Sequence, residues 1–426
     1  MYHNINMDPV TAANKVSQTI SSMEALGVYD PYSYRSTHTF PNSSKTIYDL
    51  TPRQAPTAPF HGKQIDFDVP QYGFPERMVI ESVFTVGSTS AVGTDDTNIS
   101  ERMFSDISLK QQNRTICSST PGHIRARTNS LRTEQGLINN FVSNNSSTMT
   151  ANATGVTCYT PVYFPFFEKT STYLDARFVS NLQVSCMINS LEGMGLDTTG
   201  LAAVTFRLFV WYRTLEEEAY RKYRDSNFSI ERPLSIWMAN VYQETKILAN
   251  ATSHFIDLVC PHPTFATHFF ISSTARDLGP DIAITSYSMT VAGRQMMITV
   301  PRDVQLYENG YYGASNLRVN KSGFITTLGT PREELWYGTT ASAPDTNSTV
   351  ILKQGGPAPI TLYYGEHADR SYNSGSVAFG QLSTPRLTIT SASTGDTTHQ
   401  LTVIHEYWTL GSIHPLEGIF TTGYSS

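Results

Sequence analysis

The residues that metal binding requires are few in this sequence and poorly spaced for it. The nearest approach to a metal-binding motif is Cys260-Pro-His262, followed by His268 six positions later. A cupin-type site needs a His-x-His pair on one strand, and the sequence contains no His-x-His. No second cluster of Cys or His completes a tetrahedral set of ligands. A turn between Pro261 and Pro263 is therefore the preferred interpretation, and a metal site is the weaker alternative.

Acid–base and nucleophilic chemistry is equally hard to place. His405 and Glu406 are adjacent in a predicted strand, where neighbouring side chains point to opposite faces, and His414 to Glu417 has the composition of a turn. The other Asp and Glu residues are scattered, so no glycosidase pair stands out. The motifs G-x-S-x-G, G-x-x-x-x-G-K-[ST] and G-x-G-x-x-G do not occur. The sequence predicts no catalytic, cofactor-binding or metal-binding residue, and hence not an enzyme.

The composition favours a β-protein. Hydrophobic residues make up 39% of the 426 residues and aromatic residues 11%, including 23 Tyr and 21 Phe. Charged residues reach only 15%, against about 25% in an average soluble domain. Thr and Tyr suit a pleated sheet, whereas Asn, Ser and Gly suit turns. A chain of this length has room for two large β-domains.

Net charge, apolar runs and cysteine spacing indicate which partners, membrane segments and disulfides the sequence predicts. The net charge of −6 does not favour nucleic acid over the whole surface, so no direct sequence-specific contact with a genome is expected. No run of 18 apolar residues predicts a transmembrane helix, and no signal peptide is predicted at the N-terminus. The cysteines are not spaced as C-x-x-C, which favours free, mostly buried thiols. They are Cys117, Cys158, Cys186 and Cys260.

The first part of the chain is predicted to contain a helix and an extended arm. Apolar residues recur every three or four positions over 8–27, with Asp8 as a possible cap, Pro9 in the first turn and Gly27 at the end. Such a helix could pack on its own domain or reach a neighbouring subunit, and both alternatives stay open. Residues 32–65 are polar and rich in proline, which indicates an arm with little regular structure. The N-terminal helix and arm are assigned to 1–60.

Strand signals begin after this arm. Residues 78–86 are rich in β-formers, 88–160 read as a long loop, and strands are expected again at 163–167 and 178–184. The strongest strand is 204–212, VTFRLFVWY, in which alternate apolar residues share one face and Phe209 and Trp211 cover much of the other. This pattern predicts a central strand of a sandwich.

A charged segment then separates two series of strands. Residues 214–225, TLEEEAYRKYRD, have acidic residues first and basic residues last, which favours a helix, interpreted as a solvated linker. Further strands are expected at 236–248, 255–259, 267–272, 282–292, 324–328, 360–364, 387–390 and 401–410. The predicted fold is all-β, with two tandem antiparallel jelly-roll sandwiches joined by a short helix. The first jelly roll is placed at 61–214, the linker helix at 215–235, and the second jelly roll with a C-terminal arm at 236–426.

Four segments in this order resemble major capsid proteins of large double-stranded DNA viruses. The first is 211–232, WYRTLEEEAYRKYRDSNFSIER, and the second is 256–272, which contains His262-Pro263. The third is 373–390, NSGSVAFGQLSTPRLTIT, where Ala378 and Gly380 stand in place of the family's Asn and Ser. The fourth is the tail from Tyr407 onward. The resemblance covers about residues 204–426, and its departures point to a virophage, a polinton-like virus or a divergent giant-virus relative.

The resemblance implies a structural role in a virion. A double jelly-roll capsid protein forms a homotrimer, which is a pseudo-hexagonal capsomer that tiles an icosahedral shell. Its implied partners are neighbouring capsomers, penton and minor capsid proteins, and possibly an internal membrane. Loops at 88–160 and 303–380 would supply towers and contacts between subunits. A minor capsid, penton or spike protein is the alternative within a virus, and a carbohydrate-binding β-sandwich is a further one.

Overall fold

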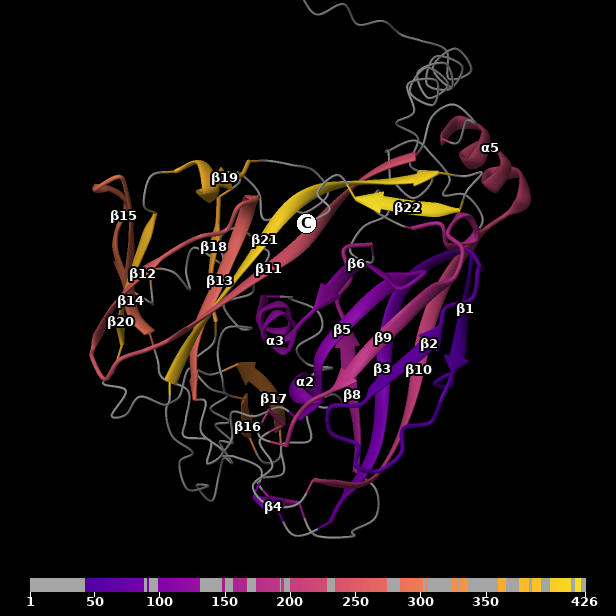
Figure 1. The fold of residues 1–426 in the computed structure, drawn as a ribbon, viewed down its shortest axis with the longest axis horizontal. Helices are drawn as coiled ribbons and strands as arrows, with labels where there is room; N and C mark the ends of the chain where they lie inside the picture. The colour runs from indigo at the N-terminus through magenta and orange to yellow at the C-terminus, as the bar shows by residue number, and fades with distance from the viewer. Residues whose placement is uncertain are drawn as a thin grey trace, which may run out of the picture.

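Two β-sandwiches lie side by side along the longest axis of the molecule (Figure 1). The computed structural model describes residues 43–87, 90–91, 99–130, 148–149, 156–166, 174–191, 193–194, 200–227, 234–273, 284–301, 304, 324–327, 330–335, 359–364, 375–382, 385–391, 399–414 and 418–422. The helix predicted at 8–27 and much of 303–380 lie outside these residues. Within them no helix is long and apolar enough to cross a membrane.

Eight strands build the first sandwich. They are β1 (Ser43–Leu50), β2 (Gln64–Asp68), β3 (Phe74–Val86), β5 (Phe104–Gln111), β6 (Arg114–Ser119), β8 (Val156–Val162), β9 (Leu182–Ile188) and β10 (Leu201–Leu215). One sheet, called sheet 1a here, has the order β1-β10-β3-β8, and the facing sheet 1b has the order β2-β9-β5-β6. Each pair of neighbours is antiparallel.

The second sandwich repeats this plan. Its strands are β11 (Leu234–Ile247), β12 (Ser253–Asp257), β13 (Pro263–Ser273), β14 (Ile284–Val291), β15 (Arg294–Pro301), β18 (Ile360–Tyr363), β20 (Arg386–Ser391) and β21 (His399–His414). Sheet 2a has the order β11-β21-β13-β18, and sheet 2b has the order β12-β20-β14-β15. When the eight strands of each sandwich are numbered along the chain, both sandwiches read 1-8-3-6 and 2-7-4-5. The prediction of two tandem antiparallel jelly rolls is confirmed.

The remaining elements are short insertions and connections. The strands among them are β4 (Ser90–Ala91), β7 (Thr148–Met149), β16 (Phe324–Thr327), β17 (Thr330–Leu335), β19 (Val377–Ala378) and β22 (Ile419–Thr422). The helices are α2 (Ile99–Arg102), α3 (Pro121–Ser130) and α5 (Glu217–Asn227), with 3-10 turns at Ala176–Phe178 and Phe379–Gln381. Helix α5 lies between the last strand of the first sandwich and the first strand of the second, within the range predicted for the linker.

The linker helix packs more closely than the sequence indicates. Its exposed side carries the i, i+4 ion pair of Glu217 with Arg221, but Tyr223 on its other side is buried against Phe74. The Arg177 guanidinium lies 3.4 Å from the centroid of the Tyr220 ring. The expectation of a merely solvated linker is therefore wrong, because an aromatic stripe on α5 anchors the helix to the end of the first sandwich.

Two segments read as irregular in the sequence contain strands or a helix. Strand β1 lies inside the expected arm and pairs with β10 along its length. The expected 88–160 loop contains β5, β6 and α3. The hairpin between β5 and β6 turns on Gln112 and Asn113, which both have positive φ, as a two-residue type I′ turn requires. The predicted strand at 178–184 is shifted, because Phe178 ends a 3-10 turn and β9 begins at Leu182.

The larger apolar core lies inside the first sandwich and continues into the second. It includes Phe206, Leu208 and Val210 from the inner face of β10, as the alternation predicts. The same cluster also contains four residues from beyond the linker, namely Ile236, Met238, Ile413 and Phe420. A separate core fills the second sandwich between sheets 2a and 2b. Residues that follow the linker in the sequence therefore complete the core of the first sandwich.

Candidate functional site at the junction of the sandwiches

The junction between the two sandwiches buries much of the outer face of sheet 2a. Strand β21 shows this most clearly, because its side chains are buried on both faces from Leu401 to Thr409. Leu401 and Val403 point into the second core. Ile404, on the opposite face, packs with Phe270 and with Ala126 of helix α3 in the first sandwich. A strand with two buried faces is a position where any polar side chain needs a partner.

Helix α3 brings the first sandwich's polar groups to this junction. Thr120 caps the helix by accepting a hydrogen bond from the His123 backbone N–H at 3.2 Å, and Pro121 occupies the first turn. Residues three and four apart share a helix face, so His123, Ala126 and Arg127 all face sheet 2a. The Thr120 hydroxyl also donates to the Gln243 side-chain oxygen of β11 at 2.5 Å.

A buried carboxylate, Glu406 of β21, lies at the centre of this contact. Its Oε1 is 3.4 Å from His123 Nε2 and 3.2 Å from His268 Nε2 of β13. The Arg127 Nε lies 4.0 Å from the same oxygen. All four side chains are at most 6% exposed. The cluster therefore links α3 of the first sandwich with two strands of the second through one acidic group.

The cationic neighbours determine the charge state of the cluster. Burial by itself would raise the pKa of Glu406, but His268, Arg127 and His123 together hold that pKa well below its usual range. Burial lowers the pKa of His123, and the nearby Glu406 only partly offsets the effect. Glu406 is accordingly ionised near neutral pH, and Arg127 supplies the permanent positive charge that compensates it.

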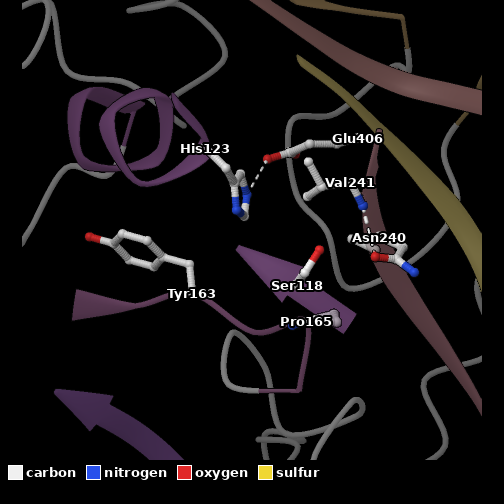
Figure 2. Close-up of a pocket in the computed structure, with 8 residues that line it drawn as sticks. Ser118, His123, Tyr163, Pro165, Asn240, Val241 and Glu406 are labelled. Carbon is white, nitrogen blue, oxygen red and sulfur yellow. Dashed lines mark hydrogen bonds and ion pairs between the residues drawn. The ribbon is translucent and has the colours of Figure 1, made fainter. Parts of the chain in front are cut away.

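A small cavity opens beside the His123–Glu406 pair (Figure 2). Its lining comes from both sandwiches and consists of Ser118, His123, Tyr163, Pro165, Ala239, Asn240, Val241 and Glu406. The cavity volume is about 10 Å³, close to the smallest space that holds one water molecule. Sites for small molecules are usually hundreds of Å³. The arrangement can therefore hold two sandwiches together, but it has no room for a substrate.

A second buried pair lies on the opposite face of β21. His405 Nε2 is 3.2 Å from Glu244 Oε1 of β11, and His405 Nδ1 is 3.0 Å from the Thr267 hydroxyl. Glu244 also accepts a hydrogen bond from the Val259 backbone N–H at 3.1 Å. These contacts keep the pKa of Glu244 below its usual value, although burial alone would raise it. The prediction that His405 and Glu406 face opposite sides of a strand is confirmed.

The residues considered for a metal site have other roles. His262 stacks on Tyr407 with ring centroids 4.0 Å apart, and the Thr264 hydroxyl donates to Cys260 Sγ at 3.4 Å. His268 belongs to the Glu406 cluster instead. Among the described residues no group of three or more His, Cys, Asp or Glu has an arrangement suited to a metal ion. All four cysteines are free and buried, as predicted.

Sequence reasoning missed the Glu406 cluster, although one signal for it is present. Glu406 interrupts the strongly apolar strand 401–410, where a charged side chain has to be paired. Its partners His123 and Arg127 lie about 280 positions earlier, in a segment interpreted as loop. Nothing in the sequence links these positions, because the contact exists only after both sandwiches have formed.

Comparisons with known proteins concern the fold. No family model matches the sequence, and no curated protein matches it. Among solved structures, PBCV-1 VP54, fitted into a reconstruction of the virophage Sputnik, has a TM-score of 0.64 at 12% identity, covering 92% of this chain and 99% of that chain. A quasi-atomic model of the PBCV-1 virus capsid has a TM-score of 0.63 at 11% identity over 92% and 99% of the two chains. The mavirus major capsid protein has 0.52 at 12% identity over 92% and 93%.

The likeness covers almost the whole of each chain, so it includes both sandwiches and the connection between them. At identities of 11–12% it shows the fold. The fold resemblance expected from the sequence motifs is confirmed, and the chain has the double jelly-roll fold.

Proposed function

We propose that this chain is a major capsid protein, a structural subunit that trimerises into pseudo-hexagonal capsomers and tiles an icosahedral virus shell. The observation that carries the proposal is the whole-chain match of a two-sandwich architecture to viral capsid subunits, with 92% of this chain and 99% of VP54 covered. Two jelly rolls per chain and three chains per capsomer give six similar units around one axis, a shape that packs as hexagons.

The junction described above supports a structural role. Its buried charged and titratable groups lie against one another between the sandwiches, and the cavity beside them is too small for a substrate. A shell subunit needs two sandwiches held at a fixed angle, and a charged cluster that is correctly paired only in one arrangement provides such a constraint. We therefore assign the chain a role in assembly and no catalytic activity.

The proposed location is the capsid shell of the virion, after synthesis and assembly inside the host cell. The proposed partners are two further copies of the chain, neighbouring capsomers, and penton and minor capsid proteins, with an internal membrane as a further candidate. The first jelly roll is placed at 61–214 with β1 added to it, the linker helix at 215–235, and the second jelly roll with its arm at 236–426. Sequence-specific binding of the genome is not part of the proposal.

The test is size-exclusion chromatography with light scattering on the purified chain, followed by electron microscopy. A species at three times 47.3 kDa that persists on dilution, and that forms hexagonal arrays when concentrated, is the expected result. A monomer at every concentration would contradict the proposal and favour a minor virion component. In that case thermal melts with a glycan panel would test the carbohydrate-binding alternative, for which ligand-dependent stabilisation is the signature.

A further inference from the structure

Helix α3 contacts sheet 2a through a small apolar cluster and a larger set of polar groups. Ala126 is the helix residue that packs with Phe270 and Ile404 of the sheet. At Gly122 the two elements approach closely, since a Cβ there would lie 3.3 Å from the Thr402 methyl group. The remaining buried groups of the helix on this side are titratable or charged. Polar interactions therefore decide much of the strength of this contact.

Two buried imidazoles in this contact have the same surroundings. His123 Nδ1 lies 3.1 Å from the Ser119 hydroxyl, and His268 Nδ1 lies 2.9 Å from the Thr361 hydroxyl. The Nε2 atom of each ring faces Glu406, at 3.4 and 3.2 Å. A neutral imidazole suits such a place, because Nδ1 accepts from the hydroxyl while Nε2–H points at the carboxylate. A further proton on Nδ1 would force the hydroxyl to accept instead and to find a new partner for its own proton.

The charges of the contact balance only while both imidazoles are neutral. Glu406 supplies one negative charge and Arg127 one positive charge, and both side chains are at most 4% exposed. The titratable and charged groups that face His123 are Glu406 and His268 of sheet 2a, Arg127 of its own helix, and Tyr163 after β8, whose ring centroid is 6.5 Å away. Each proton that an imidazole takes up therefore adds an uncompensated positive charge to a buried site, which is costly.

A path for protons to His123 is present at the junction (Figure 2). His123 and Glu406 both line the cavity of about 10 Å³, which is large enough for one water molecule. Ser118 and Asn240 add further polar groups to its wall. The imidazole can therefore exchange protons with water while both sandwiches stay folded.

Detachment of the helix changes how strongly His123 binds a proton. In the packed state, burial lowers the pKa of His123 below its ordinary value of 6.5. In water the imidazole has its ordinary pKa again. Detachment is therefore accompanied by proton uptake once the pH falls below 6.5, and acid favours the detached state. One proton taken up changes this equilibrium by as much as about tenfold per pH unit.

We propose that helix α3 holds the outer face of sheet 2a at neutral pH and detaches from it below about pH 6. Protonation of His123 and His268 beside Arg127 supplies the repulsion, and detachment uncovers Phe270 and Ile404. The sandwiches stay joined, because the apolar core that β11 and β22 share with the first sandwich contains none of these charged groups. The inference concerns the single chain. Its use in loosening a shell in an acidic compartment rests on the proposed function.

Hydrogen exchange of the purified chain at about pH 7 and about pH 5, corrected for the intrinsic effect of pH on exchange, tests the inference. Opening of α3 should be about tenfold or more greater at the lower pH. Strands β9 and β10 should stay protected over the same labelling time. Protection of α3 that is equal at the two pH values would overturn the inference. So would a simultaneous loss of protection in α3, β9 and β10, because acid would then be unfolding the whole molecule.

Two histidine variants identify the group that responds. His123→Gln keeps a polar side chain that cannot take up a proton, so the acid response of α3 should fall to about threefold or less. His254→Gln is the matched control. His254 is as buried as His123, and burial lowers its pKa too, but it lies on β12 beside Ser391 in the second sandwich. An acid response of α3 that survives in His123→Gln but not in His254→Gln would contradict the assignment.

A disulfide between the helix and the sheet provides a second test that leaves the titratable groups in place. Gly122→Cys with Thr402→Cys brings two thiols within bonding reach, as the 3.3 Å approach indicates. The oxidised variant should lose the acid response of α3, and the reduced variant, its own control, should keep it. An oxidised variant that still opens in acid would overturn the inference. A monomeric chain in which α3 opens in acid would contradict the proposed function and leave this inference standing.

Discussion

At the scale of single residues, Glu406 is the most constrained side chain of the junction. It is 1% exposed and has three cationic or titratable neighbours from two sandwiches within 4.0 Å. A buried ion group rarely adds net stability over an apolar one, but loss of one member leaves an uncompensated charge in a low dielectric. Glu406 therefore acts chiefly to fix which surfaces of the two sandwiches meet.

The first prediction is that Glu406→Gln lowers the free energy of unfolding by about 3–5 kcal/mol at neutral pH, because Arg127 stays buried without its counter-charge. Urea unfolding at fixed protein concentration measures the change. Asp257→Asn is the matched control, since Asp257 pairs with Arg386 at an exposed site and its loss should not move the midpoint measurably. An equally small effect of Glu406→Gln would show that the cluster does not hold the junction.

The second prediction concerns pH. The pKa of Glu406 is lower in the folded state, so its contribution is present above the unfolded pKa and is lost as pH falls through the folded pKa. The pKa of His123 also lies below its ordinary value of 6.5, so the unfolded chain binds that proton first and stability falls as pH drops below 6.5. Melting temperature should therefore decline from pH 7 toward pH 4, more gently in His123→Gln. A flat profile in the wild type would contradict this assignment.

At the scale of elements, strand β10 shows how much of a strand's position and burial can be predicted from the alternation of apolar and polar residues. The sequence predicts a central strand, and β10 does lie between β1 and β3. The sequence also indicates that both of its faces are mostly covered, whereas in the single chain only the inner face is fully buried. The difference lies on the outer face, where Phe209 and Trp211 are only half-buried.

The third prediction is that Leu208→Ala, on the inner face of β10, costs about 2–5 kcal/mol of stability through lost burial and a residual cavity. Leu208 is fully buried in the first core. Denaturant melts measure the change, and Phe255→Ala on the exposed face of β12 provides the comparison, with little loss expected. A loss below about 1 kcal/mol for Leu208→Ala would mean that the strand is not central to the core.

At the scale of the whole molecule, the chain's last described strand stabilises the first sandwich. Phe420 of β22 packs edge-on against Phe166, and its backbone N–H donates to the Gln111 side chain at 2.8 Å. Gln111 Nε2 also donates to the Gly418 carbonyl. The Phe420 ring lies over Gly411, where a side chain would collide with it. The two sandwiches are therefore expected to unfold together.

The fourth prediction follows from this contact. Phe420→Ala should cost about 3–5 kcal/mol and should weaken amide protection in β5 and β9, which lie far earlier in the chain, more than in β14 and β20. Hydrogen exchange measures the distribution, and calorimetry of the wild type should show one transition. Two separate transitions, with the loss confined to the second sandwich, would show that the sandwiches are independent.

The sequence alone determined the fold class and the repeated plan. Low charge, abundant Thr and Tyr, and alternation in segments such as 78–86 and 204–212 specify strands, because period-two burial is a local property. The charged segment at 214–225 separates two series of such strands, and the missing motifs left no basis for catalysis. The segment 401–410 was recognised as a strand, and the opposite orientations of His405 and Glu406 followed from that alone.

Only the tertiary structure decided the rest. The β5–β6 hairpin was not recognised because its turn, Gln112-Asn113, lacks the glycine that usually signals positive φ. Strand β1 was missed because its half-exposed pattern resembles an arm until β10 pairs with it. Glu406 contacts His123 and Arg127, which lie about 280 residues earlier in the sequence. Phe420 packs in the same core as Phe67 and Met78 of the first sandwich. These contacts form only when the two folded sandwiches pack against each other. The surfaces involved come from residues far apart in the chain, so no periodic pattern in the sequence predicts them.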